Sequence, residues 1–182
     1  MNRMIARIVG AAFAALLAGV VSAEAAGPED TLYLDLKDGR VVIEMRPDLA
    51  PKHVARIKEL VRKGFYDGLA FHRVIPGFMA QTGDPQGDGT GGSGQKLPAE
   101  FSKEPFERGT LGMARSRAPD SGDSQFFIVF LRTPHLDGQY TIWGKVTSGM
   151  EFVDRIKKGS AQENGGRVQN PDKIVRMRLA KE

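Results

Sequence analysis

The most informative part of this 182-residue chain is the stretch Phe71-His72-Arg73-Val74-Ile75-Pro76-Gly77-Phe78-Met79-Ala80-Gln81-Thr82-Gly83-Asp84. It brings an arginine, a glutamine and a Phe-Met pair close together on a segment that otherwise reads as β-strand and turn. Arg73 is always charged and carries five N–H donors in a rigid fork. Because no histidine–serine set or paired carboxylates lie nearby, this group favours chemistry that breaks no covalent bond.

The flanking sequence has the two-residue periodicity of half-buried strands. Apolar residues occupy every second position from Leu32 to Leu36 and again from Val41 to Met45. Asp38-Gly39, between the two runs, is a strong signal for a tight hairpin turn. Pro51 then begins a helix that runs to about Lys63, where Gly64 stands at the position of a C-terminal cap.

The remainder of the chain also predicts short strands. Residues 150–158 show a helical apolar face that Gly159 would end, and the strands are expected near 69–74, 78–82, 109–114, 125–130, 141–146 and 173–180. There is no internal repeat and no sign of a second globular domain. The pattern alone therefore predicts one mostly-β domain with two helices.

Three further segments accompany Phe71–Asp84 as candidate parts of the site: Gly109–Ser116, Ser124–Ile128 and Leu136–Val146. Together, in this order and at this spacing, the four segments resemble the cyclophilin family of peptidyl-prolyl cis-trans isomerases, over roughly residues 30–180. The resemblance implies a mostly-β fold, a closed eight-stranded antiparallel β-barrel capped by two α-helices. It also implies catalysed rotation about X-Pro bonds in unfolded or extended polypeptides.

The same resemblance assigns the site residues. Arg73 occupies the position of the catalytic arginine, and Gln81 is expected to hold the substrate backbone and to support Arg73. The apolar pocket for the proline ring would consist of Phe78, Met79, Phe127 and Leu136. Neighbouring residues on a strand face opposite ways, so Phe126, next to Phe127, is expected in the core.

The residues before proline would pair with the backbone of Ala114, Arg115 and Ser116, with Gln125 bracing that segment. This chain departs from several eukaryotic relatives at three positions. His135 replaces tryptophan, which predicts weak binding of cyclosporin; Tyr140 replaces histidine; and Arg115 replaces a common asparagine. The last change puts side-chain contacts at Arg115 in question, but not backbone contacts.

The N-terminus has the three-part pattern of a secretory signal peptide. Arg3 and Arg7 precede an apolar run from Ile8 to Val21, and small residues follow. The run is shorter than the ~20 residues that a spanning helix needs. We expect residues 1–23 to be a leader, with cleavage possible up to residue 26, followed by a linker over 24–29 and the isomerase domain over 30–182. The mature protein would then be periplasmic in a Gram-negative host, without membrane attachment.

Composition narrows the classes of partner. The formal charge is +4, and removal of the leader, with its two arginines and no acid, leaves +2, which is low for a nucleic-acid-binding protein. The chain has no cysteine, which removes disulfides and zinc–cysteine sites. The Gly87–Gly92 loop fits G-x-G-x-x-G formally, but no helix follows it. We therefore expect no metal, no cofactor and no nucleic acid, and a monomer.

The three histidines do not have a metal-binding spacing. His53 is expected to be solvated on the first helix, and His72 to be packed, hydrogen-bonded and turned away from the groove because it alternates with Arg73. Two other classes of function remain open at this point. The groove could grip proline segments as a holdase without useful catalysis, or it could be a decayed feature of a structural envelope protein.

Overall fold

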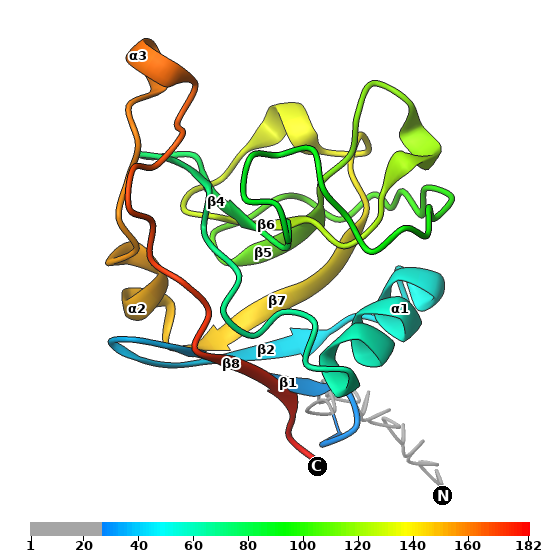
Figure 1. Cartoon of the computed structure of the whole chain (residues 1–182). Helices are drawn as coiled ribbons and strands as arrows, with labels where there is room; N and C mark the ends of the chain where they lie inside the picture. Colours follow the sequence, from blue (N-terminus) through cyan, green and yellow to red (C-terminus); the bar gives the residue numbers. More distant parts are fainter. Residues whose placement is uncertain (1–26) are drawn as a thin grey trace, which may run out of the picture.

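The computed structural model describes residues 27–182; the proposed leader therefore lies outside the described residues. Eight antiparallel strands form one curled sheet with helices packed at its ends (Figure 1). In chain order the elements are β1 (Thr31–Leu36), β2 (Gly39–Met45), α1 (Pro51–Arg62), β3 (Arg73–Ile75), β4 (Met79–Thr82), β5 (Thr110–Met113), η1 (Pro119–Ser121), β6 (Phe126–Val129), η2 (Pro134–Leu136), β7 (Ile142–Ser148), α2 (Met150–Asp154), α3 (Ala161–Asn164) and β8 (Arg176–Leu179).

The β1–β2 hairpin follows from the alternation in the sequence. Leu32, Leu34, Val41 and Ile43 are fully buried, whereas the residues between them are only partly so. The turn lies one residue earlier than expected, because the register pairs Leu36 directly with Gly39. The two-residue loop is therefore Lys37-Asp38.

The helices agree less completely with expectation. α1 ends before Gly64, which adopts the positive φ of 66° that a C-terminal glycine supplies. α2 is shorter than expected and ends at Asp154, so Gly159 does not terminate it. Instead, a Cβ on Gly159 would lie 2.3 Å from the carbonyl oxygen of Gly166, so this glycine permits a close backbone approach. The third helix, α3, was not expected.

The expected closed barrel is wrong. The strand order is β3-β4-β6-β5-β7-β2-β1-β8, and within residues 27–182 the two end strands do not pair with each other. The irregular segment 166–174 fills the interval: Val74 N–H donates to Gly166 O at 2.8 Å, and Val168 N–H donates to His72 O at 3.0 Å. Pro171 interrupts this segment and has no N–H for a ladder. The sheet is therefore a curled half-barrel.

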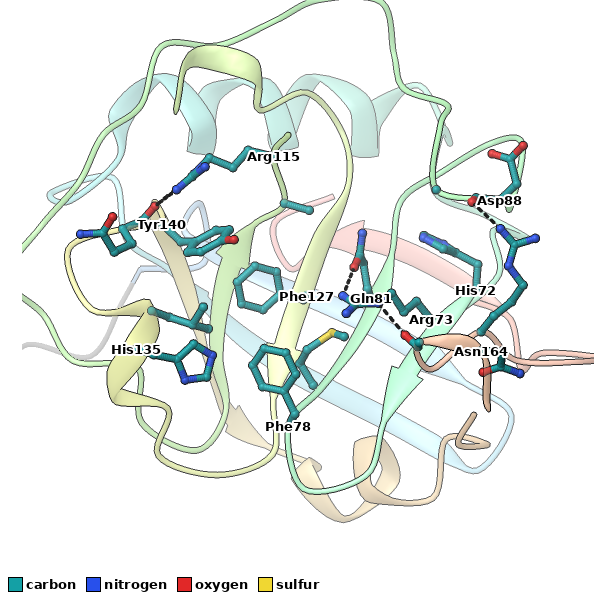
Figure 2. Close-up of a pocket in the computed structure, with 17 residues that line it drawn as sticks. His72, Arg73, Phe78, Gln81, Asp88, Arg115, Phe127, His135, Tyr140 and Asn164 are labelled. Carbon is teal, nitrogen blue, oxygen red and sulfur yellow. Dashed lines mark hydrogen bonds between the residues drawn. The ribbon is translucent and has the colours of Figure 1, made fainter. Parts of the chain in front are cut away.

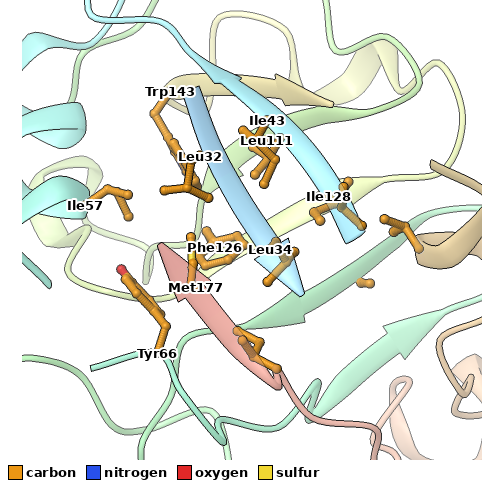
Figure 3. Packing of buried hydrophobic residues seen from close by; sticks show 14 of the residues in the cluster. Leu32, Leu34, Ile43, Ile57, Tyr66, Leu111, Phe126, Ile128, Trp143 and Met177 are labelled. Carbon is orange, nitrogen blue, oxygen red and sulfur yellow. The ribbon is translucent and has the colours of Figure 1, made fainter. Parts of the chain in front are cut away.

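The buried residues form two clusters, one on each side of β6. The main cluster joins the hairpin, α1 and β8, and includes Phe126, Trp143 and Tyr66 (Figure 3). The second is smaller and consists of Met79, Phe106, Phe127, Val129, Leu136 and Ile142. Phe126 and Phe127 thus face opposite ways, as strand alternation predicts. The smaller cluster underlies the candidate site.

Candidate active site

A cavity of about 790 Å³ opens over β3, β4 and β6 (Figure 2). Ten of the residues singled out in the sequence line it: Arg73, Phe78, Met79, Gln81, Ala114, Arg115, Phe127, His135, Leu136 and Tyr140. The other two, Ser116 and Gln125, line an adjoining cavity of about 360 Å³ that shares Gln81, Ala114 and Arg115 with the first. Segments far apart in sequence therefore meet at one groove.

The floor of the main cavity is apolar. Met79, Phe127 and Leu136 are at most 5% exposed, and Phe78 and Tyr140 pack against them. The Tyr140 ring meets Phe127 edge-on with 5.6 Å between centroids. A rigid apolar pocket of this kind accommodates a small hydrophobic ring without losing side-chain freedom on binding.

Arg73 lies beside the pocket because β3 pairs with β4 in a register that sets it opposite Gln81. Its Nε–H donates to Gly165 O at 2.9 Å, and Nη1 donates to Gln81 Oε1 at 3.2 Å. Burial lowers the pKa of Arg73, but an arginine remains protonated at neutral pH. Arg73 forms no ion pair with any carboxylate of residues 27–182. Its charge is therefore available to the cavity.

A chain of amides extends from Arg73 to the glycine-rich loop. Gln81 Nε2 donates to Gln125 Oε1 at 2.9 Å, and Gln125 Nε2 donates to the carbonyls of Gly89 at 3.1 Å and Gly91 at 2.8 Å. The expected bracing of Ala114 by Gln125 involves the backbone only, where Ala114 N–H donates to Gln125 O at 2.9 Å. The side chain of Gln125 instead braces the loop.

Arg115 is held at one end of the cavity by neutral groups. Its guanidinium lies over the Tyr140 ring, 4.5 Å from the centroid, and donates to Gln139 O from Nε at 3.1 Å and Nη2 at 2.9 Å (Figure 2). Its neighbour Ser116 is exposed, and both its N–H and its hydroxyl group hydrogen-bond to Ser121 Oγ at 2.8 Å. The 114–116 segment is therefore well anchored beside the groove.

Two expectations for the histidines are wrong. His53 is 1% exposed, because the segment that ends at Glu100 covers the start of α1 and places a carboxylate oxygen 2.6 Å from its Nδ1. His72 lines the cavity instead of turning away, and within residues 27–182 neither ring nitrogen has a hydrogen-bond partner. It precedes the first residue of β3, so strand alternation does not govern it. Burial lowers the pKa of His72, which keeps it neutral at pH 7.

The sequence analysis missed six other residues that line the cavity, five of them at the end opposite Arg115 and Gln139 beside Arg115. These are Asp88, Gly89, Gln139, Asn164, Gly165 and Arg167. Asn164 and Gly165 belong to the end of the unexpected helix α3, and Arg167 donates from Nη2 to Asp88 O at 3.1 Å. The only signal in the sequence was the Asn164-Gly165-Gly166 run, which indicates a turn but not its position in space.

Residues 27–182 contain no group of three or more histidines, aspartates or glutamates arranged to hold a metal ion. Over the same residues, no helix combines the length and the apolar character needed to cross a bilayer. The main groove instead combines an apolar pocket with a fixed cation, which suits binding and distorting a neutral chain segment.

Comparison with known proteins agrees with this geometry. Residues 31–179 match the model of the cyclophilin type peptidyl-prolyl cis-trans isomerase/CLD family. A Brucella suis protein described as a probable peptidyl-prolyl cis-trans isomerase is 62% identical, with the match covering 93% of this chain and 92% of the relative.

Solved structures show the same fold. Cyclophilin AquaCyp293 from Hirschia baltica superposes with a TM-score of 0.76 at 25% identity, over 86% of this chain and 76% of the other. A Cryptosporidium parvum cyclophilin type isomerase, crystallised in the presence of the dipeptide Ala-Pro, superposes with a TM-score of 0.74 at 28% identity, over 82% of this chain and 98% of the other. The chain therefore belongs to the family of cyclophilin-type peptidyl-prolyl cis-trans isomerases.

Proposed function

We propose that this isomerase accelerates rotation by donating a hydrogen bond from Arg73 to the prolyl nitrogen. Resonance gives the peptide C–N bond partial double-bond character and a rotational barrier of ~18–20 kcal/mol. As the bond twists, the nitrogen becomes pyramidal and regains a lone pair. A donor that meets this lone pair only in the twisted state stabilises the transition state selectively.

The contacts of Arg73 support this role. Two of its N–H groups are occupied by Gly165 O and Gln81 Oε1, which fix the plane of the guanidinium. An arginine has five such donors, so three remain for substrate. The apolar floor at Phe127 and Met79 would hold the proline ring beside them, where exclusion of water strengthens a charged hydrogen bond.

The backbone beside the groove supports recognition of an extended peptide. Ala114, Arg115 and Ser116 border both cavities, so residues before proline would lie along them and lead into the smaller cavity. The dipeptide used with the Cryptosporidium parvum relative contains an X-Pro bond, which supports proline-containing substrates here. His135 is exposed, and its ring lies 5.4 Å from that of Phe78, so it would border the proline pocket. Because histidine stands there in place of tryptophan, we propose that cyclosporin binds weakly.

We also propose that the clients are exported polypeptides and that the mature enzyme is a periplasmic monomer. The support is the leader pattern over residues 1–23, which lies outside the described residues. Expression of the full chain in a Gram-negative host, followed by N-terminal sequencing of the periplasmic product, would test this. A product that begins between residues 24 and 27 supports export, and an uncleaved cytoplasmic product contradicts it.

The mechanism is tested by Arg73→Ala. A charged hydrogen bond is worth about 1.5–3 kcal/mol, so we expect kcat/KM to fall roughly 10- to 150-fold. Affinity for the substrate peptide should change much less, because the apolar pocket remains. Both quantities are measured on one Ala-Pro-Phe peptide, by protease-coupled turnover and by NMR titration, with Arg176→Ala on β8 as the matched control.

The outcomes separate the alternatives. Turnover that is unchanged in Arg73→Ala would exclude the arginine mechanism. Wild-type protein that binds the peptide and prevents aggregation, but does not speed isomerisation, would favour the holdase interpretation.

A further inference from the structure

The lining of the main cavity carries an excess of positive charge. Its lining includes three arginines, Arg73, Arg115 and Arg167, against the single carboxylate of Asp88. The formal charge of the lining is therefore +2 with both histidines neutral. Arg115 and the Asp88–Asn164 side lie at opposite ends of the cavity, with Arg73 between them (Figure 2).

Within residues 27–182 none of the three arginines forms an ion pair. Arg115 donates to backbone carbonyls, among them Gln139 O, and Arg167 donates to the carbonyl of Asp88 at 3.1 Å. Elsewhere in the described chain arginines do pair with acids; Arg108, for example, lies 2.6 Å from the Asp154 carboxylate. The groove thus positions guanidinium groups without neutralising them.

Asp88 offsets only part of this charge. Its carboxylate accepts hydrogen bonds from Thr90, from N–H at 2.8 Å and from Oγ1 at 2.6 Å, while Arg167 contacts its main-chain oxygen. Hydrogen bonds from the Thr90 side chain and N–H lower the pKa of Asp88, with a smaller contribution from Arg167. The carboxylate is ionised at neutral pH, and an excess of positive charge remains.

We propose that this groove selects proline segments that carry aspartate or glutamate on either side of the X-Pro bond. The inference rests on the proposed function, which places the proline ring at Phe127 and the preceding residues along 114–116. Arg115 then lies beside the residues before proline, and Arg167 beside those after it. Cations in a concave, partly dry site attract anionic ligands more strongly than cations on an open surface do, and they pair well with carboxylates.

The test uses three peptides of equal length. The first has glutamine on both flanks of Ala-Pro, and in the other two glutamate replaces either the glutamine before Ala-Pro or the glutamine after it. NMR exchange measurements give kcat/KM without a coupling protease, at low and high salt. We expect each glutamate peptide to exceed the glutamine peptide roughly twofold to fivefold at low salt, the range for a partly exposed charge pair. The preference should shrink as salt screens it.

Three variants with the same loss of charge show which arginine is responsible for each preference. Arg115→Gln should abolish the preference for glutamate before proline, and Arg167→Gln the preference for glutamate after it. Arg176→Gln, on β8 and outside both cavities, should leave both ratios unchanged. Equal kcat/KM for all three peptides, or ratios that persist in both groove variants, would overturn the proposal. If the glutamine peptide is not isomerised, the proposed function fails, and the ratio of Kd values for the same peptides still decides the charge preference.

Discussion

Gln125 is expected to control the orientation of Arg73, the proposed catalytic residue, from two hydrogen bonds away. Its amide nitrogen faces the carbonyls of Gly89 and Gly91, which can only accept hydrogen bonds. This orientation turns Gln125 Oε1 towards Gln81 Nε2, and Gln81 Oε1 in turn towards Arg73. The carbonyls of the glycine loop thus determine which way both amides point.

Gln125→Glu reverses this arrangement with almost no change in size. A carboxylate has no N–H to donate, so two hydrogen bonds of about 1 kcal/mol each are lost to the loop. The resulting loss of about 2 kcal/mol corresponds to a Tm roughly 4–8 °C lower for a domain of this size. The new anion would turn away from the carbonyls and release Gln81, and Arg73 would lose its fixed plane. We expect kcat/KM to fall about tenfold, which corresponds to about 1.4 kcal/mol.

The assay compares kcat/KM and Tm for Gln125→Glu and Gln139→Glu. Gln139 lines the same cavity and undergoes the same change in charge, but within residues 27–182 its hydrogen bonds involve only its backbone. A tenfold loss in the first variant with a much smaller loss in the second supports the amide chain. Activity within twofold of wild type in Gln125→Glu, at a lowered Tm, would refute it, because the loop would then be destabilised without affecting Arg73.

Two further predictions concern the floor of the pocket and the start of α1. Gly112→Ala would place a Cβ 2.4 Å from Phe127 Cζ and 2.8 Å from Phe106 Cε1. The displaced rings should fill the proline pocket, so we expect kcat/KM to fall at least about tenfold. Tm should also drop, because overpacking costs about 1–3 kcal/mol. Unchanged kinetics would contradict this view of the pocket floor. Glu100→Gln should destabilise the protein by about 1–2 kcal/mol at pH 7 in urea unfolding, because the Glu100 carboxylate accepts from His53 and from two N–H groups at the start of α1. Burial alone would raise the pKa of Glu100, but these hydrogen bonds lower it below its ordinary 4.5. Its contribution is therefore present above pH 4.5 and is lost as the pH falls through the lower pKa of the folded state. A difference from wild type that does not diminish as the pH is lowered below 4.5 would exclude this explanation.

Local periodicity predicted much of the fold, because adjacent side chains on a strand must face opposite ways. The burial of Leu32 and Leu34, and the separation of Phe126 from Phe127, follow from that rule alone. The rule fails where regular structure stops. His72 precedes β3 and turns towards the cavity, and His53 is covered by Glu100 from 47 residues away.

The candidate site was predicted from matching segments, and the structure shows how its parts are held. The β3–β4 register explains why Arg73 and Gln81 adjoin. The loop carbonyls that orient Gln125 could not be anticipated, because the Gly87–Gly92 loop has no periodicity and its path depends on buried Asp84. This carboxylate accepts from the N–H groups of Gln86, Asp88 and Gly89 at 2.6 to 3.1 Å.

The opening in the sheet explains the position of Arg73 better than a closed barrel would. In a closed ladder, carbonyls beside β3 would pair with the N–H groups of a neighbouring strand. Here the irregular segment 166–174 forms only isolated backbone hydrogen bonds beside β3, and the carbonyl oxygen of Gly165, just before it, accepts the Arg73 Nε–H at 2.9 Å. Two residues further on, Arg167 reaches the rim of the same cavity. This irregular interval thus fixes the Arg73 guanidinium and brings a second positive charge to the same cavity, so the feature that strand periodicity could not predict is also the one that shapes the electrostatics of the groove.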